Sequence, residues 1–270
     1  MGGEAIGRLW AAVSYRPSLR FHGHVFDVAD SFAHHPRPGS DDVKPNRFQH
    51  WSTDRLQVEL CEPSRRELLQ LTNRRAAMET VAYRTEDRGT ADMEHLTKAC
   101  PRIAMILRNA VERLQVGPVT RMGVKLTVYA DLDMLFREIL EQLRPYCFPE
   151  NPRFAEITSP NVEDIALSVD YERDGATVML RLGPMKREQG VHMLESTGKA
   201  SALFERKEGG EGLPQLYAAI PDDFLCFDAD MYLKAESLAM DRWLSFVDSA
   251  ISHIVTAYHG LKDLLLEKKQ

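Results

Sequence analysis

The stretch DIALSVDYERDGATVMLRLG, residues 164–183, predicts a β-hairpin. Residues 164–172 and 177–183 alternate apolar and polar side chains, which is the two-residue period of a strand. Between them, residues 173–176 contain Asp-Gly, a pair that tight hairpin turns favour because their central positions need a positive φ. A hairpin joins antiparallel strands, so this stretch indicates that the fold contains an antiparallel sheet.

Working outward from the hairpin, further strands are expected at residues 6–15, 55–61, 67–72, 76–84, 119–130 and 223–233. The fifth of these, VTRMGVKLTVYA, places Lys125, Thr127 and Tyr129 on one face and apolar side chains on the other. This pattern is typical of a sheet with one face covered by helices and one face that is more polar.

Apolar side chains at helical spacing predict helices at residues 24–34, 91–114, 132–143 and 237–267. Pro101 either kinks the second helix or begins it, and Pro145 is expected to end the third. Residues 146–160 contain three prolines and predict an irregular connection. Residues 187–215 are rich in Gly, Glu and Lys and predict a mobile loop.

The pattern as a whole predicts an α+β fold, an antiparallel sheet backed by long helices. Both halves of the chain end in a strand followed by a long helix, so two similar sheet-plus-helix halves are one arrangement that fits. Residues 1–130 would form the N-terminal half, with 19 basic and 15 acidic side chains. Residues 131–270 would form an acidic C-terminal half, with 15 basic and 25 acidic side chains.

Composition restricts the class of protein. With 44% hydrophobic and 27% charged residues the chain resembles an ordinary soluble globular protein. It has no apolar run of the roughly 18–20 residues that span a bilayer, so we expect no membrane partner. Four cysteines without close pairs indicate free thiols in a reducing compartment, and hence a cytoplasmic protein: Cys61, Cys100, Cys147 and Cys226.

Two groups of residues are candidate binding sites. The pairs Arg65-Arg66 and Arg74-Arg75 lie in the densest basic region, residues 65–88, which could contact nucleic acid if the strands are neighbours. Pairing of these arginines with nearby glutamates on a solvated strand face is the alternative. The final helix carries an apolar stripe that covers either the sheet of its own chain or a partner protein, with Trp243, Phe246 and Tyr258 on it.

Asp228 and Asp230 are the best candidates for catalysis. They lie two apart in a predicted strand, so both carboxylates project from one face, where they could hold Mg²⁺ or Mn²⁺. A solvated strand face produces the same alternation. His22 and His24 are weaker candidate metal ligands, since they lack the spacing of known zinc sites.

No motif for nucleophilic catalysis, phosphate binding or dinucleotide binding is present, so we expect no cofactor. This favours a protein that is not an enzyme, although a metal-dependent hydrolase or nuclease using Asp228 and Asp230 remains an alternative.

Two motifs carry a family resemblance: RMGVK at residues 121–125 and FDADMY at residues 227–232, the latter followed by the long helix. Over residues 76–268 the chain resembles a sporadically distributed family of uncharacterised prokaryotic proteins with a fold like that of the export chaperone SecB. The resemblance implies an accessory or regulatory subunit, chaperone-like or associated with prokaryotic antiviral defence. Such a subunit would bind another protein or a second copy of itself.

Overall fold

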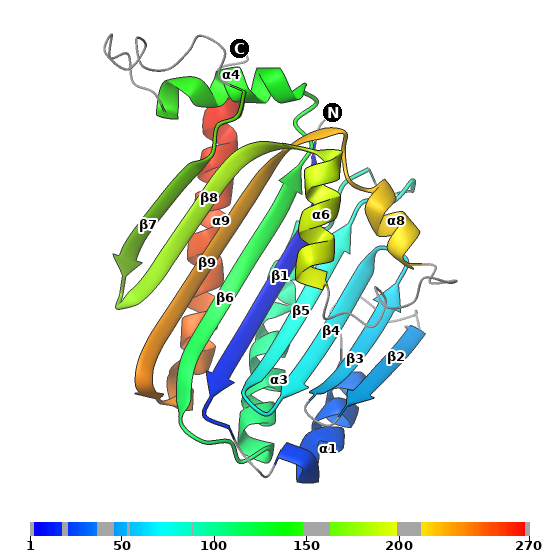
Figure 1. Cartoon of the computed structure of the whole chain (residues 1–270), viewed down its shortest axis with the longest axis vertical. Coiled ribbons are helices and arrows are strands. Elements are labelled where there is room, and N and C mark those ends of the chain that lie inside the picture. The colour runs from blue at the N-terminus through cyan, green and yellow to red at the C-terminus, as the bar shows by residue number, and fades with distance from the viewer. Residues whose placement is uncertain are drawn as a thin grey trace.

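A computed structural model of the chain describes residues 3–17, 21–36, 46–52, 55–87, 89–147, 163–198 and 212–267. These residues form an α+β fold with one antiparallel sheet of nine strands (Figure 1). The strands are β1 (Glu4–Tyr15), β2 (Asn46–Ser52), β3 (Arg55–Glu62), β4 (Arg65–Thr72), β5 (Arg75–Tyr83), β6 (Val119–Ala130), β7 (Leu167–Arg173), β8 (Ala176–Lys186) and β9 (Asp223–Leu238). Their order across the sheet is β2-β3-β4-β5-β1-β6-β9-β8-β7.

Seven α-helices and one 3₁₀ helix accompany the sheet in the described part of the chain. They are α1 (Phe21–His34), α2 (Met93–Lys98), α3 (Cys100–Arg113), α4 (Phe136–Cys147), α6 (Arg187–Gly198), α8 (Gly212–Ala218), η1 (Met240–Arg242) and α9 (Trp243–Glu267). None of the helices in these residues is long and apolar enough to cross a membrane.

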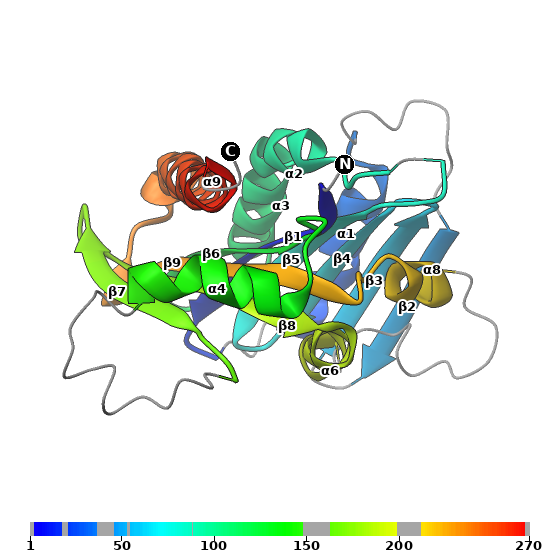
Figure 2. The same ribbon diagram turned by 90° about the horizontal axis from the view of Figure 1, so that it is seen from above.

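The helices lie on both faces of the sheet but cover them unequally. Figure 2 shows α2, α3 and α9 on one side and α6 on the other. The main core lies between the sheet and the helices α2, α3 and α9. Apolar side chains of β1, β3, β4, β5, β6, β8 and β9 are buried in it. A smaller core lies under α6 and α8 and includes Ile6, Tyr129 and Phe224.

Alternation along β1 sends its side chains to these two environments. Leu9 and Val13 are buried in the main core. Arg8, Trp10 and Ser14 point to the opposite face. We call this face, consisting of these three residues, Ala12 and their cross-strand neighbours, the open face, because α6 and α8 cover only one end of it.

Most of the elements predicted from the sequence are confirmed. The hairpin of β7 and β8 turns at Asp174 and Gly175, which have φ values of 50° and 77°. Pro101 does not kink a continuous helix. It lies in the first turn of α3, where its missing N–H costs no hydrogen bond.

Two expectations are wrong. Pro145 does not end α4, which continues to Cys147, since the proline falls in the last turn and removes little of the helix ladder. The expected mobile loop at 187–215 instead contains α6 and α8, which bury Leu194 and Leu216 against the sheet, while residues 199–211 lie outside the described ones. The edge strand β2 was not predicted.

The two residue ranges predicted as halves contribute unequal, contiguous parts of one continuous sheet. Strands of residues 1–130 occupy six adjacent positions, and strands of residues 131–270 occupy the remaining three. The two parts meet where β6 pairs with β9 over most of the length of β6.

Candidate functional site

The open face contains a cavity of about 350 Å³, which we call the hollow. Strands β4, β5, β1, β6 and β9 form it, and Met193 of α6 closes one side. The residues that line it are Arg8, Trp10, Ala12, Ser14, Leu68, Gln70, Arg75, Ala77, Glu79, Arg121, Gly123, Lys125, Thr127, Met193 and Asp230.

Small side chains make the floor of the hollow. Ala12 pairs with Ala77 on one side and with Gly123 on the other, so three adjacent strands present a methyl group or a hydrogen atom at the same level. Larger side chains stand on the neighbouring rows, where Trp10 pairs with Glu79 and Lys125. The depression therefore follows from the pairing register of β5, β1 and β6.

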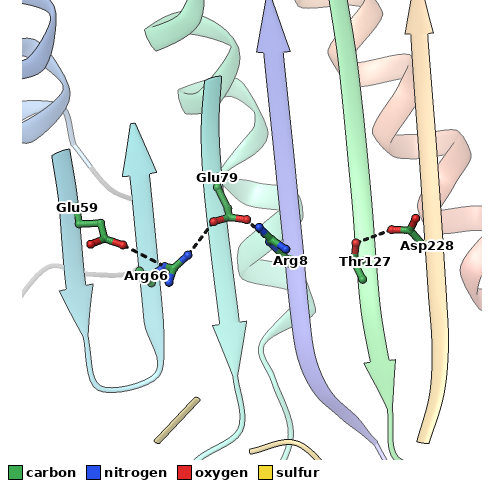
Figure 3. A network of polar contacts seen from close by, with 6 residues as sticks. All are labelled: Arg8, Glu59, Arg66, Glu79, Thr127 and Asp228. Atoms are coloured by element: carbon green, nitrogen blue, oxygen red, sulfur yellow. Dashed lines mark hydrogen bonds and ion pairs between the residues drawn. The ribbon is translucent and has the colours of Figure 1, made fainter. Parts of the chain in front are cut away.

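A chain of ion pairs runs beneath one wall of the hollow (Figure 3). Glu79 pairs with Arg8 and accepts a hydrogen bond of 2.8 Å from Nη2 of Arg66. Arg66 Nε lies 3.6 Å from Oε1 of Glu59. The Arg66, Glu79 and Glu59 side chains are almost completely buried, so each charge depends on its neighbours for compensation.

The position of Glu79 between two arginines fixes its protonation state. Burial by itself raises the pKa of Glu79, but Arg8 and Arg66 outweigh it and hold the pKa below its ordinary value. Glu79 is consequently a carboxylate at neutral pH and serves to keep two guanidinium groups in place.

The structure places Asp228 and Asp230 on the open face, as their spacing predicted. Asp228 accepts a hydrogen bond of 2.7 Å from the hydroxyl of Thr127. It also forms an ion pair with Lys125, in which Nζ lies 2.9 Å from Oδ2. Asp230 Oδ2 lies 3.3 Å from Nη2 of Arg121. Each carboxylate thus already pairs with a cationic side chain. That side chain balances the negative charge that a bound metal ion would otherwise balance.

Asp230 is less completely satisfied than Asp228. Its Oδ1 atom is buried and accepts no hydrogen bond from the described residues. Burial raises the pKa of Asp230, and Asp228 adds to this effect, while Arg121, Lys125 and Arg181 act against it. Oδ1 of Asp230 is therefore a hydrogen-bond acceptor with unused capacity just beneath the lining of the hollow.

The histidines do not join the two aspartates. His24 is exposed on α1, which packs against β3, β4 and α3 on the opposite side of the sheet, and its Nδ1 lies 3.5 Å from Asp27. The side chain of His22 lies outside the described residues. Among the residues that the structure describes, no three His, Cys, Asp or Glu side chains are grouped to hold a metal ion.

The four predicted arginines separate rather than form one groove. Arg65 pairs with Asp92 at 3.0 Å, beside the start of α2, while Arg66 is buried among glutamates on the open face. Arg74 is exposed in the turn before β5. Arg75 lines the hollow.

The stripe of the final helix covers the chain's own core. Trp243, Phe246 and Tyr258 are at most 8% exposed, and the Trp243 indole N–H donates a 2.8 Å hydrogen bond to the carbonyl of Ala104 in α3. These three side chains stabilise the packing of α9 and offer no surface to a partner.

Cys61, Cys100 and Cys226 are free thiols, as expected from their spacing. Burial raises the pKa of each to about 12, so none is a reactive thiolate at neutral pH. The side chain of Cys147 lies outside the described residues.

No protein-family model and no curated protein matches this chain.

Sequence reasoning missed the hollow itself. The signal was present only in part: alternation placed Lys125 and Thr127 on a polar face, and the same alternation in β1 groups Arg8, Trp10 and Ser14. What the sequence lacks is the strand order, which sets β1 between β5 and β6 and brings these side chains together.

Proposed function

We propose that the chain is a non-enzymatic binding protein, an accessory or regulatory subunit, that captures its ligand or partner on the open face. The observation that supports this is the hollow: a depression with a floor of small residues and walls of charged and aromatic side chains. Its volume of about 350 Å³ falls within the range of small-molecule sites and also admits a side chain of a partner protein.

The chemistry of the lining supports binding rather than catalysis. The commonest activated nucleophiles are a hydroxyl or thiol beside a histidine; no histidine or cysteine is among the residues that line the hollow, and the Lys125 amine is held in an ion pair with Asp228. The hydroxyl of Thr127 donates to Asp228, and Glu79 is held as a carboxylate between two arginines. These groups fix a shape and a charge pattern.

The SecB-like arrangement belongs to the same proposal. A SecB-type sheet backed by long helices agrees with the layers of this chain, in which α3 and α9 lie on one side of the sheet. Under this proposal the protein works in the cytoplasm of a prokaryotic cell, in a complex that serves regulation or antiviral defence.

A variant that fills the hollow tests the proposal. Ala12 points into the hollow from the central strand, so Ala12→Leu places three additional carbon atoms on its floor. The protein would be isolated from its native host and its companions, whether protein or small molecule, identified by native mass spectrometry. We expect a stoichiometric companion on the wild type and its loss from Ala12→Leu.

The matched control is Met105→Ala, because Met105 is 41% exposed on α3 and belongs to the opposite side of the sheet. This variant should keep the companion. An equal amount of companion on wild type and Ala12→Leu, with both proteins folded, would contradict binding at the hollow.

A further inference from the structure

A row of cations crosses the open face at one end of the hollow. Ser14 of β1 pairs with Arg75 of β5 on one side and with Arg121 of β6 on the other, and Arg121 pairs with Lys234 of β9. Cross-strand partners project from the same face, so these cationic side chains stand side by side. A hydroxyl lies at the centre of the row.

Arg75 is a half-buried cation of this row that has no carboxylate partner among the described residues. It donates a 2.7 Å hydrogen bond to the neutral Gln70 and lies 5.8 Å from the centre of the Trp10 ring. Burial lowers the pKa of Arg75, and the positive charge of Arg55 lowers it further. An anion is the partner that this environment lacks.

The spacing of the two arginines suits one anionic group. Strands β5 and β6 are separated by β1 alone, so the backbones of Arg75 and Arg121 are roughly 10 Å apart, twice the usual strand spacing. Arg75 can reach above Ser14. The Arg121 guanidinium, in contrast, pairs with Asp230 at 3.3 Å and lies 4.1 Å from the centre of the Tyr232 ring, so Arg121 shares an anion there by turning from these contacts. Guanidinium groups bind carboxylates and phosphates with paired hydrogen bonds, and the Ser14 hydroxyl can add one more.

The rest of the hollow suits a flat, partly polar group. Next to the cation row, Ala12 and Gly123 leave the floor low, and Trp10 stands beyond them on the following row. A Cβ atom placed on Gly123 would lie 3.3 Å from Cβ of Tyr232 and 3.8 Å from Oδ1 of Asp230. Oδ1 of Asp230 thus lies next to this space but has no exposed surface, so a ligand N–H or O–H meets it only if the carboxylate turns toward the hollow.

We infer that the hollow binds a small molecule that combines a flat ring with a phosphate or carboxylate group. The ring lies over Ala12 and Gly123 beside Trp10, and the anion lies at Ser14 between Arg75 and Arg121. This inference rests on the proposed function and names the class of ligand for the same site.

Binding measurements with four probes test the inference. Adenosine 5′-monophosphate supplies a ring with a phosphate, indole-3-acetate supplies a ring with a carboxylate, and adenosine and inorganic phosphate each lack one of the two parts. Isothermal titration of the purified chain should detect at least one of the first two, and which of them binds identifies the anion. Adenosine and inorganic phosphate should bind at least about tenfold more weakly, since each loses one set of contacts.

Variants assign the anion to its arginines. Arg75→Gln and Arg121→Gln should each weaken binding of the preferred probe by about tenfold or more, because each removes a charge-assisted contact. Arg113→Gln, on the exposed end of α3, makes the same change of charge elsewhere and should leave the affinity unchanged. Circular dichroism would verify that each variant is folded; Arg121 is 44% exposed, so its variant has little core to disturb.

The inference is overturned if neither ring-bearing anion binds, if inorganic phosphate binds as tightly as they do, or if both arginine variants keep the wild-type affinity. Such a result leaves the proposed function standing when Ala12→Leu still loses its native companion. Retention of the companion by Ala12→Leu would instead remove the proposed function, whatever the four probes show.

Discussion

Glu79 shows how a single residue organises the open face. Its carboxylate lies between Arg8 and Arg66, and its side chain is 4% exposed. Burying one ion is costly, and here the cost is offset only because three charges are buried together with mutual hydrogen bonds. Removing the central charge takes from Arg8 and Arg66 the carboxylate that they share and leaves Arg66 with the more distant Glu59.

We therefore predict that Glu79→Gln destabilises the protein by about 3–5 kcal/mol, the usual effect of breaking a buried ion pair. Equilibrium unfolding in urea at pH 7 measures this. The pKa of Glu79 is lowered, so its stabilising effect is present above the unfolded pKa of about 4.3. This stabilisation disappears as the pH falls through the lower folded pKa of Glu79. The free energies of unfolding of the wild type and of Glu79→Gln should therefore converge in acid.

Glu112→Gln is the control for this loss. Glu112 makes a pair of 2.8 Å with Arg108 on the exposed surface of α3, and its side chain is 53% exposed. Because water screens this exposed pair, Glu112→Gln should destabilise the protein by at most about 0.5 kcal/mol. Equal destabilisation by the two substitutions would contradict the view that burial makes the pairs of Glu79 stronger than an exposed ion pair.

Asp230 gives a prediction of opposite sign. Its pKa is raised by burial despite the nearby Arg121, so ionisation makes the folded state less stable as the pH rises through the folded pKa. Asp230→Asn removes this effect. The melting temperature of the variant should equal or exceed that of the wild type at pH 7, and the difference should shrink as the pH falls through the raised folded pKa to the unfolded pKa of about 3.9. A lower melting temperature at pH 7 would mean that the ion pair with Arg121 outweighs burial.

At the scale of elements, one substitution should have opposite effects in a turn and in a helix. Gly175 has a φ of 77° in the β7–β8 turn, whereas Gly260 lies inside α9, and a Cβ on either would meet no atom within 4 Å. Gly175→Ala should cost about 1 kcal/mol because an L-residue resists positive φ. Gly260→Ala should stabilise by about 0.5–1 kcal/mol because alanine favours the helix. Thermal unfolding should show a lower melting temperature for Gly175→Ala and a higher one for Gly260→Ala than for the wild type. Melting temperatures that shift in the same direction would contradict this account.

The elements that could be predicted are those whose signal is local. Alternation located β1 and β6, and the Asp-Gly pair located the turn of the hairpin. Prediction failed where tertiary contacts decide. The segment of α6 has a composition typical of a loop, yet burial of Leu194 against the ends of the central strands holds it as a helix. Similarly, β2 is a strand because β3 offers it a complete row of backbone partners.

At the scale of the molecule, the candidate site depends on pairings between distant segments. Ser14, Arg75 and Arg121 are more than forty residues apart from one another in sequence and become neighbours only through the order β5-β1-β6. Alternation assigns each side chain to a face of its own strand. It carries no information on which strands adjoin, so the row of cations could not be predicted.

The same order predicts that the chain unfolds as one unit rather than as two halves. Glu4 of β1 accepts hydrogen bonds of 2.9 Å from Tyr258 and 2.7 Å from Lys262 of α9, which ties the first strand to the last helix. Trp243 of α9 also bonds to α3. Separating residues 1–130 from residues 131–270 would expose the whole pairing edge of β6 and the apolar side of α9.

We therefore expect coincident urea transitions of the full chain when tryptophan fluorescence and far-ultraviolet circular dichroism are compared, as two-state unfolding requires. Trp10 and Trp243 report on opposite faces of the sheet and on different halves, so fluorescence is sensitive to any separate step. The fragments 1–130 and 131–270, expressed alone, should show no cooperative transition. A fragment of residues 1–130 that melts sharply by itself would instead make the N-terminal six strands an independent domain, because β6 would then be stable as an unpaired edge.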